Sequence, residues 1–429
     1  MPSTGCTLGR VLVDDAVLPA AAHLTGPHAR AVLAAAVDAA GGRLERARPC
    51  HLQYRPGHDV VVRFDSRVSW AGREAVDETL VAATTGSGPP PGTLPVEATT
   101  PDGVGMSVGV WRWPFDPLLP GLTHAVTPSH CATFLAGLVA GPLRLEVVAY
   151  RPTLRAVVRV TGGDRVVYVK ALAPREIAAL VERHERFLSA GVPVPHVLRI
   201  DADRGLVAMA ELAGPTVRDR LRAGRGPLPD AAQYEALFAA LAGAELPGPV
   251  LAGRAATGVR HAAMLATVLP AQAGRLDELA AILRDARHRA ADRVGPTVHG
   301  DLYEAQLVTG RGRHRAHDIT GVLDLDDAGP GDPLDDRATV VAHLLERALE
   351  TGGATGRRVA GYATDLRRSF AARVDPVELD LVISGALTGL ATGPFRLQRP
   401  RWARAVRRRL VVATRLATAP GERTLRIGS

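Results

Sequence analysis

The stretch that decides the fold reads VHGDLYEAQLV at positions 298–308 and continues as GVLDLDDAGPGDP at positions 321–333. Each part contains a short apolar run that predicts a strand, and each strand leads to a carboxylate at a turn: Asp301 in the first and Asp324 in the second. A side-chain amide, Gln306, follows Asp301 by five residues. Phosphoryl transfer requires one carboxylate that orients and deprotonates a hydroxyl, together with further oxygen ligands for Mg²⁺.

This spacing resembles the catalytic segment of the aminoglycoside phosphotransferase and choline kinase-like family, within the protein kinase-like superfamily. In that family the pattern is His-Gly-Asp, four residues, an amide ligand, and then a strand that ends in Asp. The resemblance covers residues 145–395 and is sharpest at Val167–Leu172, Pro193–Pro195 and His299–Ala338. It implies an α+β, bilobal protein kinase-like fold, in which a small β-rich nucleotide lobe precedes a larger, mainly helical lobe.

The resemblance also assigns roles to individual residues. Asp301 would be the catalytic base that accepts the proton of the substrate hydroxyl. Gln306 and Asp324 would be the Mg²⁺ ligands; most of the family has asparagine at the first position, and maltokinase-type members share the glutamine. Asp326 follows Asp324 by two residues, so on a strand it points to the same side and could be a second ligand or a substrate contact. We expect His299 to brace the loop through hydrogen bonds.

Lys170 is the only lysine of the chain, which also lacks asparagine. Because every other basic position is arginine, a site that keeps lysine is a candidate for a role that needs a compact point charge instead of a planar fork. The resemblance places Lys170 at the α- and β-phosphates of ATP. Its usual helix glutamate partner stays open: Glu176 flanks the apolar face of the next helix, Glu182 lies opposite, and His184 lies at the centre.

We divide the chain into three parts. Residues 1–140 form an accessory N-terminal α+β subdomain, residues 141–214 the small nucleotide-binding lobe, and residues 215–429 the helical lobe with the catalytic segment 298–338. Hydrophobic periodicity and turn residues predict the main elements. Strands are expected at 60–64, 106–113, 145–150, 156–161, 166–172 and 207–210; helices at 29–40, 128–138, 174–191, 217–221, 231–244, 276–293, 333–349, 376–391 and 403–419.

The first two parts share a short repeat. YRPG at 54–57 with VVR at 61–63 matches YRPT at 150–153 with VVR at 157–159, at a constant offset. At that offset Glu74 would occupy the position of Lys170. The N-terminal subdomain is therefore either a degenerate relative of the small-lobe hairpin or a coincidental match between two valine-rich hairpins. The second turn lacks glycine, so Arg151 or Arg155 could contribute to phosphate contact.

Near the end of the catalytic segment, a group of carboxylates has a structural interpretation. Asp332, Asp335 and Asp336 surround Pro333, where a helix is expected to begin, and we predict that they cap it.

The composition is that of a globular protein, with 46% hydrophobic and 22% charged residues. No run of about 18 apolar residues occurs, so we expect no transmembrane helix. Asp14 and Asp15 interrupt the N-terminal apolar stretch, so we expect no signal peptide. Cys6, Cys50 and Cys131 are scattered and odd in number, which suggests reduced thiols and a cytoplasmic protein.

The formal net charge is +8, and the densest basic run is Arg399–Arg409. A nucleic-acid face is one interpretation of this run. We favour a solvated face of a C-terminal helix instead, because no recognisable DNA- or RNA-binding motif accompanies it.

The expected activity is Mg²⁺- and ATP-dependent phosphorylation of a hydroxyl on a small molecule. The acceptor stays open. An acidic cleft of Asp324, Asp326 and Asp327 would suit a cationic amino sugar or amine, whereas the maltokinase-like Gln306 suggests a neutral sugar. A non-catalytic nucleotide sensor or scaffold is the alternative from another class, motivated by Gln306 and by the missing glutamate partner of Lys170. ATP and GTP are not distinguished.

Overall fold

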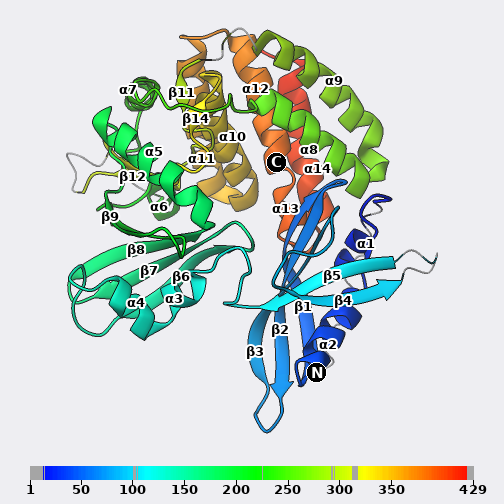
Figure 1. Ribbon diagram of the computed structural model, residues 1–429. Coiled ribbons are helices and arrows are strands. Elements are labelled where there is room, and N and C mark those ends of the chain that lie inside the picture. The colour runs from blue at the N-terminus through cyan, green and yellow to red at the C-terminus, as the bar shows by residue number, and fades with distance from the viewer. Residues whose placement is uncertain are drawn as a thin grey trace.

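The computed structural model describes residue 13 and residues 15–422, except 100–102, 104, 225, 291, 292, 294 and 312–316. Cys6 and Asp14 lie outside this part of the chain. Two β-rich regions precede a mainly helical one (Figure 1). The α+β class is confirmed, as is the arrangement of a small β-rich lobe and a larger helical lobe with an additional N-terminal α+β region.

The first region holds the N-terminal sheet, defined here as strands β1–β5. Its elements are α1 (Ala20–Thr25), α2 (Ala29–Ala39), β1 (Gly42–Arg55), β2 (Asp59–Trp70), β3 (Val76–Thr85), β4 (Leu94–Thr99) and β5 (Gly105–Arg112). Gly41 ends α2 with a φ of +79°, a left-handed conformation that glycine adopts without a Cβ clash. Two short helices, α3 (Leu122–Val126) and α4 (Pro128–Phe134), lead to the next region.

The second sheet consists of strands β6–β10. Its elements are β6 (Arg144–Arg151), β7 (Arg155–Gly162), β8 (Arg165–Leu172), the 3₁₀ turn η1 (Pro174–Glu176), α5 (Ile177–Ser189), β9 (Val197–Asp201) and β10 (Leu206–Ala210). The predicted strands and the helix between them are present. Residues 211–216 then connect β10 to the helical region.

The helical region surrounds the predicted catalytic segment. Its helices are α6 (Val217–Ala223), α7 (Ala231–Ala242), α8 (Arg254–Val268), α9 (Ala273–Ala290), α10 (Leu334–Thr351), α11 (Gly353–Ala371), α12 (Pro376–Leu390), α13 (Gly393–Arg396) and α14 (Trp402–Thr418), with the 3₁₀ turn η2 (Pro270–Gln272). The short strands are β11 (Thr297–Val298), β12 (Leu307–Thr309), β13 (Ile319–Val322) and β14 (Gly329–Pro330). Helices α8 and α11 were not predicted.

The two five-stranded sheets have the same strand order. The N-terminal sheet runs β1-β2-β3-β5-β4 and the second sheet runs β6-β7-β8-β10-β9, antiparallel throughout. The sequence repeat falls on the same hairpin of each sheet, because the turns are closed by Arg55 with Asp59 and by Arg151 with Arg155. The shared topology favours a structural relationship between the two regions over coincidence.

Strand register corrects one detail of the repeat. Val157 pairs with Lys170, and its counterpart Val61 pairs with Ala83, so Ala83 and not Glu74 occupies the position of the lysine. Glu74 lies in the β2–β3 turn. The prediction was wrong because a constant offset assumes hairpins of equal length, whereas β2 and β3 extend further than β7 and β8.

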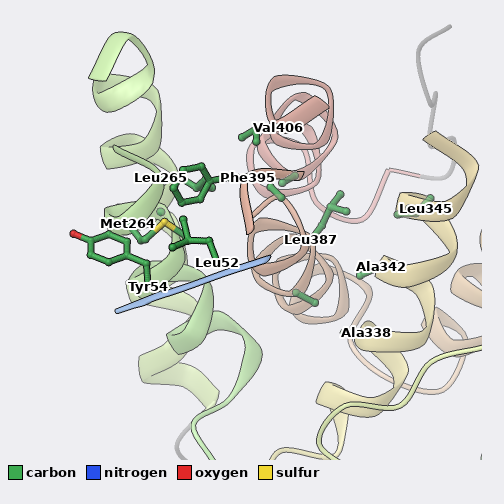
Figure 2. Close-up of a cluster of buried hydrophobic side chains, with 14 of the residues drawn as sticks. Leu52, Tyr54, Met264, Leu265, Ala338, Ala342, Leu345, Leu387, Phe395 and Val406 are labelled. Atoms are coloured by element: carbon green, nitrogen blue, oxygen red, sulfur yellow. The ribbon is translucent and has the colours of Figure 1, made fainter. Parts of the chain in front are cut away.

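Both faces of the N-terminal sheet are buried, which explains apolar runs such as 60–62 and 80–83. On one face, Val62 and Phe64 belong to a core shared with α1, α2 and the C-terminal helices. On the other face, Val61 and Ala83 belong to the core of the second sheet. Figure 2 shows Leu52 of β1 beside the helices that carry Met264, Leu265 and Phe395. The N-terminal sheet therefore packs against both lobes.

Candidate active site

Lys170 lies at the end of the second sheet that faces the helical region. Its strand β8 pairs with β7 and β10, and the side chain is almost completely buried. The ammonium donates a hydrogen bond to Asp326 and lies 3.7 Å from Asp324. The structure thus supplies the carboxylate partner that the sequence left open: it is Asp326, from the segment after β13. The helix residues do not fill this role.

Helix α5 places a histidine near the lysine. His184 is buried, and its Nδ1 donates to the carbonyl of Pro195 at 2.9 Å. Burial lowers the pKa of His184, and Lys170 lowers it further, so the imidazole is neutral. Glu176 is exposed, and Glu182 pairs with Arg186 on the solvent side.

Arg155 bridges the two carboxylates that follow β13. Its guanidinium donates to Asp324 at 2.7 Å and to Asp326. Burial alone would raise the pKa of Asp326, but the charges of Lys170 and Arg155 outweigh burial and lower it to about 2. Asp326 is therefore ionised throughout the neutral range, and both carboxylates are compensated by cations of the second sheet.

The backbone of Asp324 is in a strained conformation. Its φ is +61°, in the left-handed region that residues other than glycine seldom occupy. Such a conformation costs about 1–3 kcal/mol and often occurs at functional sites. Here it turns the chain directly after β13, which directs the Asp324 side chain toward Arg155 and Lys170.

Asp301 lies in a loop that five hydrogen bonds hold in place. The Asp336 carboxylate accepts the amide hydrogens of His299 at 2.7 Å and Gly300 at 2.9 Å. His299 donates from Nε2 to the carbonyl of Leu323 at 3.0 Å, which ties the loop to the residue before Asp324. Arg254 donates to the Gly300 carbonyl and, at 3.1 Å, to the Asp301 carboxylate. The bracing role predicted for His299 is confirmed.

Gly300 could not carry a side chain. Its φ is +81°, and a Cβ would lie 2.3 Å from the carbonyl oxygen of Asp327. The loop therefore approaches the segment after β13 closely, and that approach brings Asp301 near Asp327. Burial raises the pKa of Asp327, with the negative charges of Asp301 and Asp326 adding to the effect.

Gln306 is buried beside the segment that leads to Asp324. Its backbone carbonyl accepts the amide hydrogen of Leu323 at 2.9 Å. Its side-chain oxygen accepts the amide hydrogen of Tyr303 at 3.2 Å, and its side-chain nitrogen has no partner among the described residues. A carbonyl oxygen has a second lone pair, so the amide retains acceptor capacity as well as an unused donor.

A cavity of about 270 Å³ opens between the second sheet and the connection to the helical region. Its lining is largely apolar, with Val148, Val157, Met209, Leu212 and Leu323 among its walls. The charged residues of the lining are Glu211 and the cluster of Arg155, Lys170 and Asp324. An apolar cavity with a cluster of charged groups has the chemistry of a site for a small molecule that carries both an apolar and a charged part.

The carboxylates around Pro333 are structural, as predicted, but only one acts on its own helix. Asp332 accepts the amide hydrogen of Leu334 at 2.9 Å and pairs with Arg293 at 2.8 Å. Asp335 instead accepts the amide hydrogen of Arg254 at 2.9 Å, and Asp336 holds the Asp301 loop. The capping prediction was wrong for these two because neighbouring segments supply closer donors.

The basic run Arg399–Arg409 divides into paired and exposed residues. Arg409 is buried and pairs with Glu346 at 2.9 Å and Glu350 at 2.8 Å, and Arg399 also pairs with Glu350. Other arginines of the run, such as Arg404 and Arg408, are exposed. The predicted amphipathic helix is present as α14, and part of the basic run serves to attach it to α10. Among the described residues, no helix is long and apolar enough to cross a membrane.

Sequence reasoning missed three contributors to the site: the bridging position of Arg155, the loop-holding role of Asp336, and Arg254. Arg155 was considered only as a phosphate contact. Arg254 begins a helix that was not predicted, since Gly258 interrupts its sequence pattern. Gly258 is present because α8 and α12 cross closely: a Cβ there would lie 2.8 Å from the Cα of Gly385.

No family model matches the sequence, and no curated protein is significantly similar to it. Solved structures do match. A choline/ethanolamine kinase family protein from Mesorhizobium loti is 18% identical with a TM-score of 0.45, over 68% of this chain and 92% of that chain. Aminoglycoside phosphotransferase APH(3'')-Id from Streptomyces rimosus is 22% identical with a TM-score of 0.42, over 62% of this chain and 98% of that chain. Its complex with ADP and streptomycin matches with 21% identity and the same TM-score, over 63% and 98% of the two chains.

Proposed function

We propose that this protein is a small-molecule kinase that transfers the γ-phosphate of ATP to a hydroxyl group. The observation that carries the proposal is the convergence of Lys170, Asp324 and Asp326 beside an apolar cavity that Lys170 and Asp324 line, with Asp301 on a braced loop next to the same segment. These groups come from distant parts of the sequence. Their meeting brings together a phosphate-binding cation, oxygen ligands and a candidate base.

In the proposed reaction the base of ATP occupies the apolar cavity, and Lys170 contacts the phosphate chain. The acceptor hydroxyl lies against Asp301, whose carboxylate takes its proton. The hydroxyl oxygen bonds to the γ-phosphorus as the bond from that phosphorus to the bridging oxygen breaks, and ADP leaves. Because such transition states need little covalent help, catalysis rests mainly on positioning and charge compensation.

Magnesium fits the donor set of this site. Among the described residues, no group of three or more histidine, cysteine or acidic side chains is placed to hold a metal ion. Mg²⁺ in kinases needs only one or two carboxylates, since nucleotide phosphates and water complete its shell. Asp324 would hold the ion together with the amide oxygen of Gln306. The ion would neutralise charge on the β- and γ-phosphates.

A non-catalytic nucleotide sensor is the second candidate. It is favoured by Arg155, whose guanidinium already compensates Asp324, the carboxylate that a metal would use, as well as Asp326. For a kinase, Arg155 has to turn from these carboxylates to the incoming phosphates. For a sensor, it keeps them occupied, and nucleotide binds without transfer.

Two measurements test the proposal. Thermal unfolding is recorded with Mg²⁺-ATP, with ATP and EDTA, and with Mg²⁺-GTP, on the wild type and on Lys170→Ala. We expect a metal-dependent rise of the midpoint that Lys170→Ala largely removes, because a ligand that binds only the native state stabilises it. Arg67→Ala, at a half-buried position of β2 that does not line this cavity, is the control and should keep the rise.

ADP release is then measured with a panel of hydroxylated acceptors. Asp301→Asn should lower turnover by about 10²–10⁴-fold, the usual contribution of a general base, while nucleotide binding persists. Asp203→Asn, in the exposed turn between β9 and β10, should behave as wild type. Nucleotide binding without ADP release for any acceptor would favour the sensor. Undiminished turnover in Asp301→Asn would remove Asp301 from the mechanism.

A further inference from the structure

A second cavity, which we name the junction cavity, lies where the N-terminal sheet meets both lobes. It has a volume of about 740 Å³, which falls in the range of small-molecule sites. The tip of the β1–β2 hairpin lies near α8 and α13 (Figure 1), and residues from all three line the cavity. The lining includes Gln53, Arg55 and Asp59 from the hairpin, and Arg260, His261 and Arg396 from the helices.

The charged residues of this lining do not balance. Asp59 is the acidic residue of the lining, and its carboxylate accepts hydrogen bonds of 2.9 and 3.0 Å from Arg55 of the same hairpin. Arg260 and Arg396 have no acidic partner among the described residues. Arg396 is partly buried, and burial lowers its pKa, with the positive charge of Arg151 contributing. A partly buried guanidinium that forms no ion pair with a carboxylate can form charge-assisted hydrogen bonds to a bound anion.

Two histidines respond to this excess of positive charge. Burial lowers the pKa of His261 to about 4, with Arg396 and Arg260 adding to the shift. His51 of β1 also has a pKa of about 4, for which burial and then Arg396 are responsible. The Nδ1 atoms of both imidazoles are buried without a hydrogen-bond partner among the described residues. The surroundings of Arg396 are therefore positive in several directions.

One residue of the junction cavity interacts electrostatically with the candidate base. Arg396 is close enough to Asp301 for the carboxylate to oppose the lowering of the arginine's pKa. Leu154, at the tip of the β6–β7 turn, lines both the junction cavity and the cleft that contains Asp326 and Asp327. The junction cavity and the cleft of Asp326 and Asp327 therefore share the tip of the β6–β7 turn as part of their walls.

That turn is fixed from the N-terminal side. The Gln53 side chain donates to the carbonyl of Pro152 at 3.1 Å, and the buried Asp116 accepts the amide hydrogen of Thr153 at 2.8 Å. Thr153 has a φ of +66°, so these two contacts hold a strained turn tip. The N-terminal region consequently shapes both the cavity and its boundary with the nucleotide.

We propose that the junction cavity binds the phosphate acceptor, and that this acceptor is a small hydroxylated molecule with a carboxylate or phosphate group held by Arg396 and Arg260. The inference rests on the proposed kinase function and names its substrate class. Two of the three acidic residues that favoured a cationic acceptor, Asp324 and Asp326, are already paired with Arg155 and Lys170, and the candidate base Asp301 pairs with Arg254. The N-terminal region then supplies part of the acceptor site.

The test uses the full chain with its nucleotide site filled by Mg²⁺-ADP, at constant ionic strength. Inorganic phosphate is the first probe, and its effect on the unfolding midpoint is titrated. We compare the wild type with the double variant Arg260→Gln/Arg396→Gln and with Arg404→Gln/Arg408→Gln, which removes the same charge from an exposed face of α14. Phosphate should stabilise the wild type and the control, and the double variant should need at least about tenfold more phosphate, as expected when a charge-assisted contact is lost.

Four hexoses on one scaffold then define the class: glucose, glucosamine, glucuronate and glucose 6-phosphate. Either anionic sugar should stabilise the wild type more than glucose does, and the better of the two distinguishes a carboxylate from a phosphate. Failure of phosphate to bind, binding that survives in the double variant, or stronger stabilisation by glucosamine would overturn the inference. A normal Mg²⁺-ADP shift in those samples would confine the failure to the acceptor class, whereas no nucleotide shift in the wild type would refute the kinase proposal itself.

Discussion

The N-terminal sheet and the second sheet share their strand order and the position of one repeated hairpin, yet they meet the rest of the protein in different ways. In the second sheet, the turn residue Arg155 reaches Asp324 and Asp326 of the helical region. In the N-terminal sheet, the corresponding Asp59 is bound by Arg55 of its own turn. One hairpin directs its charge outward to a distant segment, and the other neutralises its charge locally.

The strand positions differ in the same sense. Lys170 in β8 points an ammonium at the carboxylates after β13, whereas its counterpart Ala83 in β3 is buried in the core between the two sheets. A methyl group can pack where an ammonium could not, because an unpaired buried charge is costly. The same topology thus carries the proposed nucleotide-binding face in one region and forms a packing layer in the other.

The difference shows that strand order alone does not specify function. The two sheets differ in the residues at two equivalent positions. The hairpin turn carries Asp59 or Arg155, and the third strand carries Ala83 or Lys170. The groups that these residues can contact determine what each sheet does. The N-terminal sheet fills the space between the lobes with apolar side chains, and its β1–β2 tip presents polar groups to the junction cavity.

The largest effect should come from removing a packing contact of the N-terminal sheet. Leu52 is 1% exposed and lies against the helices of Figure 2. Leu52→Ala should lower the free energy of unfolding by about 2–5 kcal/mol, since it removes a buried side chain and leaves a cavity. Urea denaturation measures this loss. Leu94→Ala, at a position that is 40% exposed in β4, is the matched control and should change stability by less than about 0.5 kcal/mol.

The same denaturation experiment examines whether the N-terminal sheet is an integral layer. Because its core is continuous with that of the helical region, unfolding of both should occur in one transition. A separate early transition that Leu52→Ala shifts, while the main transition stays unchanged, would show that the N-terminal sheet folds independently. The sheet would then not be an integral layer of the protein.

A smaller effect should follow from acid, and it concerns the second sheet. The folded pKa of Asp326 is about 2, below the ordinary value of 3.8. The unfolded chain therefore takes up this proton first as the pH falls, so the stabilisation is present above pH 4 and is lost as the pH falls through 2. It is worth on the order of 2 kcal/mol.

We would measure unfolding free energies between pH 5 and pH 2 for the wild type, Asp326→Asn and Arg155→Gln. The difference between the wild type and Asp326→Asn should shrink by about 2 kcal/mol over that range, because only the wild type loses this carboxylate's contribution. In Arg155→Gln the loss should begin at higher pH, since Lys170 alone then holds the carboxylate. A difference that stays constant with pH would mean that the two cations do not stabilise the ionised Asp326.

The sequence indicated most of the residues that the structure brings together at the candidate site, because the motif residues lie on short elements with strong local signals. His299 and Asp301 surround a glycine that the loop requires, and Asp324 ends a short apolar strand. Lys170 could be identified by its uniqueness in an arginine-rich chain. The strands of the second sheet were predictable for a similar reason, since alternating valines and glycine turns delimit them.

What the sequence could not predict depends on contacts between distant segments. Arg155 and its carboxylates are separated by 169 and 171 residues, and nothing local indicates that they meet. The register of β2 and β3 depends on strand length, so a fixed offset misplaced the counterpart of Lys170. Helices α8 and α11 contain glycines that look like interruptions, whereas Gly258 in α8 allows a close helix crossing.

The smallest effect should come from the ion pair that makes the two hairpins differ. Arg55 and Asp59 form a bidentate pair, but the arginine side chain is 74% exposed, so solvent screens the interaction. Asp59→Ala should therefore change the free energy of unfolding by less than about 1 kcal/mol, and the change should decrease further in high salt. Chemical denaturation at low and high ionic strength measures it. A cost of several kcal/mol at both ionic strengths would show that the N-terminal turn depends on its Arg55–Asp59 pair. Both hairpins would then rely on a strong ion pair, and they would differ only in where the partner lies. A small, salt-dependent change would support the difference between the two hairpins. The turn of the N-terminal sheet then carries a weak surface pair, Arg55 with Asp59, whereas the turn of the second sheet carries Arg155, which bridges to the carboxylates of the candidate active site.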